Sequence, residues 1–339
     1  ILLRLCSAPI MTKSNPQNKT EDDRKPSLPQ VIAILGPTCS GKSSIAVNIA
    51  ERLGGQIISC DSMQIYKGMD IGTATPPPEV LKKITHHLVN ELDIHQRYDA
   101  HKFVTKAKII LPQIACQHPG TPVVLVGGTG LYAKALIYGY DMQPSDRRVY
   151  QQVESEYAGG AGEKPLRKEL LRAFPDISRS KLINPRRLMR SVEILRLNGD
   201  PRTGGQNKAA RQVLPGWQQY VVMPPPNEWH RDLERRTRNM LENGWIEETA
   251  ELVADGLLQT PTAHQALGYR EIAAYLEGKI TSKNDLYRQV LRKTRQYARR
   301  QRTWFRHQHP GAYVLSLRPG LPSTDIATAI ITEYLSQTL

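Results

Sequence analysis

An eight-residue stretch near the start of the chain has the residue types and spacing of a phosphate-binding loop. The stretch, GPTCSGKS, has the form G-x-x-x-x-G-K-[ST] and follows an apolar run. It consists of Gly36, Pro37, Thr38, Cys39, Ser40, Gly41, Lys42 and Ser43. Glycines let successive N–H groups point inward, and the next helix directs its positive dipole end at the same place. We therefore expect Lys42 to reach terminal phosphates and Ser43 to hold Mg²⁺.

A second candidate for chemistry follows the apolar run QIISC at 56–60. This run ends in Asp61, and Ser62, Met63 and Gln64 come next. A glutamine amide can bind the donor and acceptor edge of adenine, and a carboxylate beside it can take a proton from an exocyclic amine. A purely structural interpretation also fits, with Asp61 capping a helix and Gln64 in solvent.

The stretch VGGTGLY at 126–132 follows a third apolar run. Its glycines allow close backbone approach, and Thr129 offers a hydroxyl at the end of the run. A tight turn before a helix explains the same residues, so this motif alone does not identify a ligand.

These residues need a sheet whose strands end at one edge. Strand-like runs occupy 31–35, 56–60, 122–127, 220–223 and 312–317, with helical patterns between them. Alternating apolar strands and helices predict an α/β fold, a P-loop parallel sheet with flanking helices. Ligands of such sheets bind at the carboxyl edge of the strands, where Asp61 is expected.

The charged stretch 141–206 lacks a strand signal and predicts a small helical insertion domain. The P-loop core then comprises 30–140 and 207–320, with a C-terminal helix over 321–339. The polar, proline-punctuated residues before it predict a disordered N-terminal segment over 1–29. Arg4 interrupts the first apolar residues, which argues against a signal peptide, and Met11 is a candidate start.

Composition restricts the class of protein. The 339 residues carry a net charge of +14, which suits a polyanionic partner, although a merely basic surface also fits. No apolar run reaches the ~18 residues of a membrane-spanning helix. Four scattered cysteines without a C-x-x-C pair suit a reducing cytoplasm, with neither disulfides nor a zinc site.

The segment 288–306 predicts an amphipathic helix with a basic face. At ~100° per residue its arginines fall in one stripe about 80° wide, opposite an apolar face. The stripe consists of Arg288, Arg292, Arg295, Arg299, Arg302 and Arg306. The stripe itself contains no acidic residue, so we expect it to contact a phosphate backbone rather than solvent alone.

Together these motifs resemble those of the tRNA dimethylallyltransferases, also called tRNA isopentenyltransferases. The motifs are GPTCSGKS, DSMQIYKGMDIGTATP and GGTGLY, followed by NPRRLMRSVEILRLNG, RTRNMLENGWIEE, QALGYRE and YARRQRTWFR. The resemblance covers roughly 31–307. It implies transfer of a dimethylallyl group from dimethylallyl diphosphate to the exocyclic amine of adenosine 37, which is 3′ to the tRNA anticodon. The loop would then hold the diphosphate, and a carbon–oxygen bond would break.

The resemblance also implies roles for particular residues. Asp61 matches the general base, Thr129 a second adenine contact and Arg236 the catalytic arginine. On a helix Arg236 shares a face with Leu233 and Met240, although neighbouring Arg235 leaves its direction open. The residues implied to contact tRNA are Asp61, Ser62, Met63, Gln64, Thr129, Arg147 or Arg148, Arg186, Arg187, Leu188, Met189, Arg190, Arg295 and Arg299.

The sequence departs from the family pattern in places. Asp232 stands where an arginine is usual, and no cysteine follows Cys116, so the bacterial type without a zinc finger fits. The partners implied are the anticodon stem-loop of tRNA and dimethylallyl diphosphate, with no membrane, in a cytoplasmic monomer. A P-loop small-molecule kinase is the main alternative, and a nucleic-acid-stimulated ATPase is a third. The kinase would leave the arginine stripe without a role. The ATPase would need a metal-supporting acid and a water-positioning residue, and neither follows the third strand.

Overall fold

The computed structural model describes residues 30–140, 142–143, 145–203 and 213–338. The predicted disorder over 1–29, with Met11, lies outside them. The chain folds into two compact units, and each is described by itself. The larger unit includes the chain up to Ile137 and from Leu214 onward, and the smaller unit is Tyr138–Val213.

A parallel sheet forms the centre of the larger unit. Its strands are β1 (Val31–Leu35), β2 (Gln56–Ser59), β3 (His86–His87), β4 (Val123–Gly127), β5 (Trp217–Met223) and β6 (Tyr313–Ser316). Their order is β3-β2-β4-β1-β5-β6, and every pairing is parallel. The predicted α/β fold with a parallel sheet is confirmed. Sequence patterns did not indicate β3, because a two-residue strand has no measurable periodicity.

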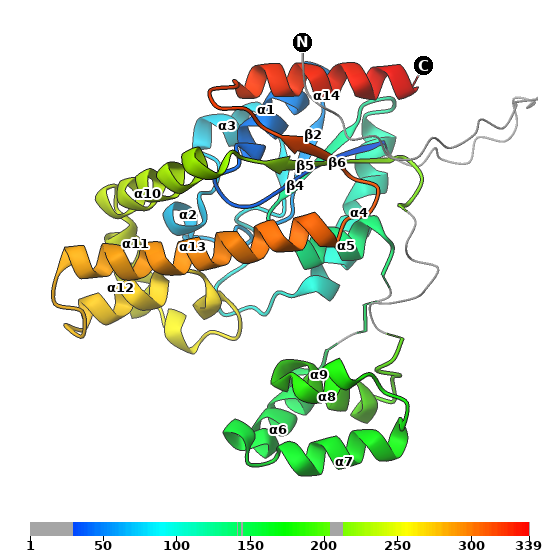
Figure 1. Cartoon of the computed structure of the whole chain (residues 1–339), viewed down its shortest axis with the longest axis vertical. Helices are drawn as coiled ribbons and strands as arrows, with labels where there is room; N and C mark the ends of the chain where they lie inside the picture. Colours follow the sequence, from blue (N-terminus) through cyan, green and yellow to red (C-terminus); the bar gives the residue numbers. More distant parts are fainter. Residues whose placement is uncertain (1–29, 141, 144, 204–212, 339) are drawn as a thin grey trace, which may run out of the picture. The chain divides into compact units, whose positions relative to one another are not determined.

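Helices cover both faces of this sheet (Figure 1). On one face α1 (Lys42–Leu53) packs against the C-terminal helix α14 (Ser323–Thr338). Ile45, Ile49, Ile326 and Ile330 form a core there with apolar side chains of β1, β4 and β5. On the other face lie α4 (Ala100–Gln117) and α5 (Gly130–Ile137). These layers bury β1 completely, as its uninterrupted apolar sequence requires.

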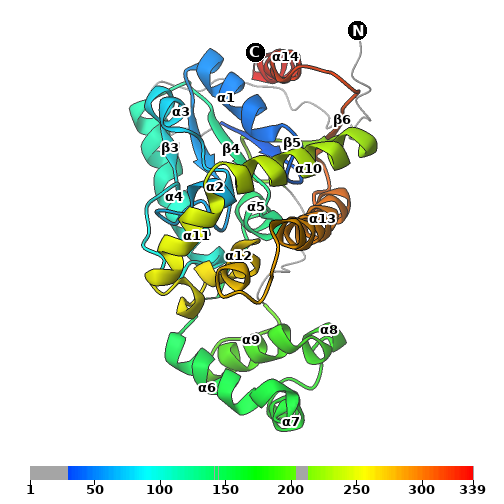
Figure 2. The same cartoon turned by 90° about the vertical axis from the view of Figure 1, so that its left-hand side faces the viewer.

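The larger unit has further helices besides these. They are α2 (Asp70–Thr73), α3 (Pro78–Lys83), α10 (Pro226–Glu242), α11 (Trp245–Ala254), η2 (Leu257–Gln259), η3 (Ala263–Gln265), α12 (Tyr269–Leu276) and α13 (Lys283–His307). Helices α10 and α13 lie side by side (Figure 2). The predicted amphipathic character of α13 is confirmed, since Val290, Leu291, Ala298 and Phe305 are buried.

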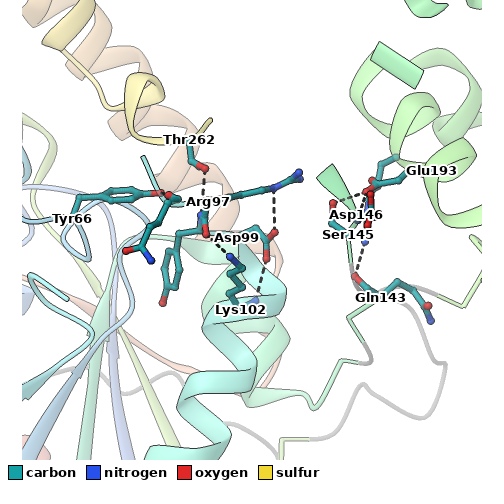
Figure 3. A network of polar contacts seen from close by, with 12 residues as sticks. Tyr66, Arg97, Asp99, Lys102, Gln143, Ser145, Asp146, Glu193 and Thr262 are labelled. Atoms are coloured by element: carbon teal, nitrogen blue, oxygen red, sulfur yellow. Dashed lines mark hydrogen bonds and ion pairs between the residues drawn. The ribbon is translucent and has the colours of Figure 1, made fainter. Parts of the chain in front are cut away.

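Hydrogen bonds fasten the segment that enters α4, as Figure 3 shows. Asp99 caps this helix by accepting the Lys102 N–H at 3.1 Å, and the Lys102 ammonium donates to the carbonyl of Arg97 at 2.8 Å. Nearby, the Tyr66 hydroxyl donates to the carbonyl of Gln96 at 3.1 Å. The Tyr66 bond ties this segment to the loop that follows β2.

The smaller unit is helical in its described residues. It contains α6 (Arg147–Tyr157), η1 (Ala158–Gly160), α7 (Glu163–Ala173), α8 (Arg179–Ile183) and α9 (Pro185–Arg196). These helices share a core of their own. The chain leaves the larger unit at Ile137 and returns at Leu214, whose N–H donates to the Ile137 carbonyl at 3.1 Å. The entry and exit points of the smaller unit are therefore hydrogen-bonded neighbours.

None of the helices in the described ranges is long and apolar enough to cross a membrane.

Candidate functional site

The predicted phosphate-binding loop connects β1 to α1, and three of its residues have positive φ. Gly36 has φ 154°, Cys39 58° and Gly41 79°. A Cβ on Gly36 would lie 2.5 Å from the carbonyl oxygen of Val222, so only glycine fits there. The Lys42 ammonium folds back to donate to the Pro37 carbonyl at 3.3 Å. The loop thus has the turned backbone that an anion cradle requires.

Two helices from later in the chain hold this loop through Thr38. The Thr38 N–H donates to Oε1 of Gln301 on α13 at 2.9 Å. Its carbonyl accepts the indole N–H of Trp229 on α10 at 2.8 Å. Beside it, the buried Ser40 hydroxyl has no hydrogen-bond partner among the described residues. In a phosphate-binding loop, such a hydroxyl is suited to hydrogen-bond a phosphate oxygen.

The loop forms one wall of a pocket of about 700 Å³. The lining residues are Cys39, Ser40, Gly41, Lys42, Ser43, Ser44, Asp70, Ile71, Ala74, Thr75, Asp232, Arg235, Arg236, Asn239, Met240 and Asn243. They come from the loop, from α2 and the turn after it, and from α10. Asp61 and Thr129 are not among them.

Two neighbouring arginines of α10 line the pocket in different ways. Arg236 is half-buried, and its guanidinium lies 3.9 Å from the Cys39 thiol. Arg235 is exposed and forms an ion pair with Asp232 at 2.6 Å. Asp232 is the residue that stands where the family usually has an arginine. The structure thus separates the two arginines that the sequence left open. Arg236 faces the loop, while Arg235 is neutralised at the rim.

The charges around the pocket also shift the pKa of Lys42. Burial and then the charge of Arg236 lower its pKa from the usual value to about 8, against an opposing effect of the Asp61 carboxylate. Burial and a nearby cation both disfavour the charged form of a lysine, and a nearby anion favours it. A diphosphate in the pocket would supply that anion.

Asp61 follows β2 at the carboxyl edge of the sheet, as expected. Its Oδ1 accepts the N–H groups of Met63 at 2.9 Å and Gln64 at 3.4 Å. No helix begins here, so this oxygen holds the turn after β2 and does not cap a helix. Its Oδ2 accepts no hydrogen bond within the described part of the chain. One oxygen therefore fixes the carboxylate, and the other remains available to take a proton.

Thr129 lies beside Asp61 because β2 and β4 are adjacent. Its hydroxyl accepts the Ser62 N–H at 3.1 Å, and its own N–H donates to the Cys60 carbonyl at 3.2 Å. A Cβ on Gly127 would lie 2.0 Å from the same carbonyl oxygen, which explains the glycine. The structure thus brings Asp61, Ser62 and Thr129 together at one edge.

Gln64 differs from the prediction of an adenine-reading amide. Its amide nitrogen donates to the carbonyls of Thr73 at 3.3 Å and Ala74 at 3.1 Å, and its oxygen accepts the Ser59 hydroxyl at 2.8 Å. The amide braces the turn after α2, so an adenine would have to displace these bonds. Met63 is half-buried next to it.

The smaller unit also corrects part of the tRNA-contact prediction. Leu188 and Met189 are buried in its core and expose no contact surface. Arg190 donates to the buried carboxylate of Glu193 at 2.5 Å and to the Gln143 carbonyl at 2.6 Å. Arg190 therefore has a structural role within this unit.

Other arginines of this unit stay on its surface. Arg147 and Arg148 are exposed in the first turn of α6, which Asp146 caps through the Arg148 N–H at 2.8 Å. Arg186 and Arg187 are exposed in the first turn of α9. Both pairs are therefore accessible to a polyanion. Because Arg147 and Arg148 are both exposed, exposure does not show which of them would contact tRNA.

The basic stripe of α13 is less uniform than predicted. Arg295 forms an ion pair with Glu234 of α10, so an acid from a neighbouring helix reaches the stripe. The guanidinium of Arg302 lies over the Trp229 ring, 5.2 Å from its centroid. Arg292, Arg299 and Arg306 are exposed and have no ion-pair partner in the described ranges. These three are the free cations of the stripe.

Sequence reasoning missed two polar residues that organise the site. Gln301 bonds to the phosphate-binding loop, and its only sequence signal is a polar residue in the apolar face of α13. Glu248 of α11 accepts the N–H groups of Asp70 at 2.8 Å, Ile71 at 2.6 Å and Gly72 at 3.1 Å. Glu248 thereby caps α2, which forms a wall of the pocket. It lies 176 to 178 positions later in the sequence than the residues that it caps.

The described residues contain no group of three or more His, Cys, Asp or Glu side chains that could hold a metal ion.

Comparison with known proteins identifies similar chains. Residues 64–308 match the family model described as IPP transferase. A tRNA dimethylallyltransferase of Halorhodospira halophila is 40% identical over 286 residues, which cover 83% of this chain and 91% of that protein. One of Myxococcus xanthus is 34% identical, with coverage of 85% and 92%.

A solved structure of the tRNA isopentenylpyrophosphate transferase from Bacillus halodurans has a similar fold. The TM-score is 0.64 at 29% identity, and the match covers 91% of this chain and 98% of that one. The fold is also similar, with a TM-score of 0.71 at 24% identity, to a structure titled as a eukaryotic dimethylallyltransferase acting on tRNA.

Proposed function

Because this chain belongs to the IPP transferase family, we propose that it transfers a dimethylallyl group from dimethylallyl diphosphate to the exocyclic amine of adenosine 37 in tRNA. It is an enzyme of tRNA prenylation, as its relatives over most of the chain are. The kinase alternative is not favoured, since those relatives are named for dimethylallyl transfer. The family match is the observation that carries the proposal, and the loop beside Asp61 agrees with it.

The pocket provides the donor site in this proposal. Backbone N–H groups of the loop, with Lys42 and Arg236, bind the diphosphate. When the amine nitrogen bonds to the allylic carbon, the carbon–oxygen bond breaks and its electron pair goes to the diphosphate. Fixed cations stabilise that growing negative charge without reorganising, which is how a preorganised site lowers a barrier.

The strand ends provide the acceptor site. The Oδ2 atom of Asp61 takes the proton that the amine loses as it is alkylated. The Thr129 hydroxyl accepts the Ser62 N–H and donates to the Ser62 hydroxyl at 3.5 Å, a long bond that it can exchange for one to the adenine. The adenine must leave its stack to reach these residues, as bases do in other enzymes that modify them.

The residues of the loop fit a magnesium ion bound with the donor. Ser43 lines the pocket next to Lys42, and the Ser40 hydroxyl lacks a partner among the described residues. Magnesium prefers oxygen ligands, keeps several waters and commonly bridges phosphates. When bound, it would add positive charge at the diphosphate, and Ser43 is the protein ligand we assign.

The surfaces for tRNA in this proposal are the free arginines. Arg292, Arg299 and Arg306 on α13, and the exposed arginines of the smaller unit, suit the phosphates of an anticodon stem-loop. We further propose that the enzyme acts as a monomer in the cytoplasm, where tRNA is modified. Size-exclusion chromatography with light scattering tests the monomer.

Incubation with labelled dimethylallyl diphosphate, Mg²⁺ and bulk tRNA tests the function. We expect label in tRNA, and mass spectrometry of anticodon-loop fragments should locate it at adenosine 37. An anticodon stem-loop with guanosine at that position is the control and should stay unlabelled. Failure to label tRNA, together with ATP-dependent phosphorylation of a small molecule, would overturn the proposal in favour of a kinase.

A further inference from the structure

One buried amide connects the two loops that form the two halves of the site. Gln301 of α13 is 7% exposed. Its Oε1 accepts the Thr38 N–H of the phosphate-binding loop at 2.9 Å, and its Nε2 donates to the Gly128 carbonyl at 2.8 Å. A Cβ on Gly128 would lie 2.5 Å from that nitrogen, so the glycine makes room for the bond. Both ends of the amide are therefore used.

The two loops joined by Gln301 carry different substrates in the proposed function. Thr38 belongs to the diphosphate cradle, two residues before the unpartnered Ser40 hydroxyl. Gly128 precedes Thr129, whose hydroxyl accepts the N–H of Ser62, the residue after Asp61. Hydrogen bonds and chain neighbours thus connect the cradle through Gln301 to Ser62, the residue next to the general base.

The position of Gln301 on α13 also relates the site to the basic stripe. Tyr297 lies one turn earlier on the inner side of the helix, close enough to the Asp61 carboxylate that this charge, after burial, raises the pKa of its phenol. Arg299, between them in sequence, is exposed. One rigid helix therefore presents arginines outward and the bridging amide inward.

We propose that Gln301 is a positioning residue for prenyl transfer, which sets the distance between the diphosphate cradle and the Asp61–Thr129 edge. The inference rests on the proposed function. In-line attack needs the reacting nitrogen and carbon about 3–3.5 Å apart, and a displacement of about 1 Å can cost roughly 10²-fold in rate. Gln301 acts through Thr38 and Gly128 and touches neither substrate.

The replacement Gln301→Met tests this role with a side chain of similar size that makes no hydrogen bond. With both substrates saturating, we expect the single-turnover rate to fall about 10- to 100-fold. The dissociation constant of tRNA and the KM of the donor should change less than about threefold, because each half of the site persists. Gln296→Met, at an exposed position on the same helix, is the matched control and should leave all three unchanged.

A purely structural role gives a different result. It would lower the unfolding temperature of Gln301→Met while the rate per folded molecule stayed within twofold of the wild type. That result would overturn the proposal. A loss of donor or tRNA affinity as large as the loss of rate would also overturn it, because it would make Gln301 part of one binding site.

If the methionine variant does not fold, the variant Gln301→Glu provides a second test of the same role. An ionised carboxylate can accept the Thr38 N–H but repels the Gly128 carbonyl, whereas a protonated one restores both bonds. Burial raises the pKa of such a carboxyl, so the variant-to-wild-type rate ratio should rise severalfold as pH falls from 8 to 6. A ratio that does not change with pH would contradict the proposal. If the wild type itself does not prenylate tRNA, the proposed function fails instead.

Discussion

Donor binding should depend on pH through Lys42. Its pKa of about 8 is set by burial and by Arg236, two effects that the negative charge of a bound diphosphate offsets. The bound state therefore favours the ammonium form. Affinity should be full below pH 8 and should fall as pH rises through it, because an increasing fraction of free enzyme must first take up a proton.

The pKa fixes the size of this effect. With a pKa of 8, about three-quarters of free Lys42 carries a proton at pH 7.5 and roughly one molecule in eleven at pH 9. If only the ammonium form binds tightly, the apparent dissociation constant should rise about eightfold between these values. The last ionisation of the diphosphate, near pH 6, is complete by then and contributes little.

Isothermal titration calorimetry with dimethylallyl diphosphate and no tRNA measures both consequences. At fixed Mg²⁺ concentration, titrations in buffers of different ionisation enthalpy at pH 8 should reveal uptake of about half a proton per ligand. Lys42→Gln is the control and should bind weakly with no pH dependence. Lys42→Arg, which stays charged, should also lose the pH dependence.

Two outcomes would refute this reasoning. Equal affinity of the wild type at pH 7.5 and 9 would show that the pocket does not lower the Lys42 pKa. An eightfold change that persists in Lys42→Gln would assign the titration to another group.

Three further predictions address the acceptor edge, the pocket wall and the basic stripe. Asp61→Asn should lower single-turnover transfer by ~10²–10⁴-fold yet leave the unfolding temperature nearly unchanged, because an amide oxygen keeps the Oδ1 bonds; near-normal transfer would exclude Asp61 as the base. Glu248→Ala should lower the free energy of unfolding by about 2 kcal/mol, since three backbone N–H groups lose their acceptor, and denaturant unfolding that matches the wild type would contradict this. Arg299→Gln should reduce the salt slope of tRNA affinity by nearly one unit, as one lost phosphate contact predicts, whereas Arg295→Gln should reduce it less because of its ion pair; fluorescence titrations at several salt concentrations would reveal the opposite order.

Local patterns predicted the parts of the site that are local in sequence. The phosphate-binding loop needs its glycines and Lys42 within a few residues, and Asp61 follows directly from the end of an apolar strand. The parallel sheet was predictable for the same reason, because each of its longer strands is a short apolar run between helical patterns.

Contacts between distant segments were not predictable in this way. Glu234 reaches Arg295 across 61 residues, and Gln301 reaches Thr38 across 263, so no window of sequence contains either pair. Leu188 and Met189 were a different kind of error. They were assigned to tRNA with the rest of their motif, although their spacing from Val192 is that of a buried helix face.

The hydrogen bond between Leu214 and Ile137 has a consequence for how this protein can vary. Because the smaller unit leaves and rejoins the larger one at adjacent residues, its length and content are decoupled from the register of the sheet. Closing so short a gap takes only a few residues, and lengthening it costs little loop entropy. The region is thus a natural point for grafting: the smaller unit could be trimmed, enlarged or exchanged with that of a relative, and the sheet of the larger unit would not have to refold.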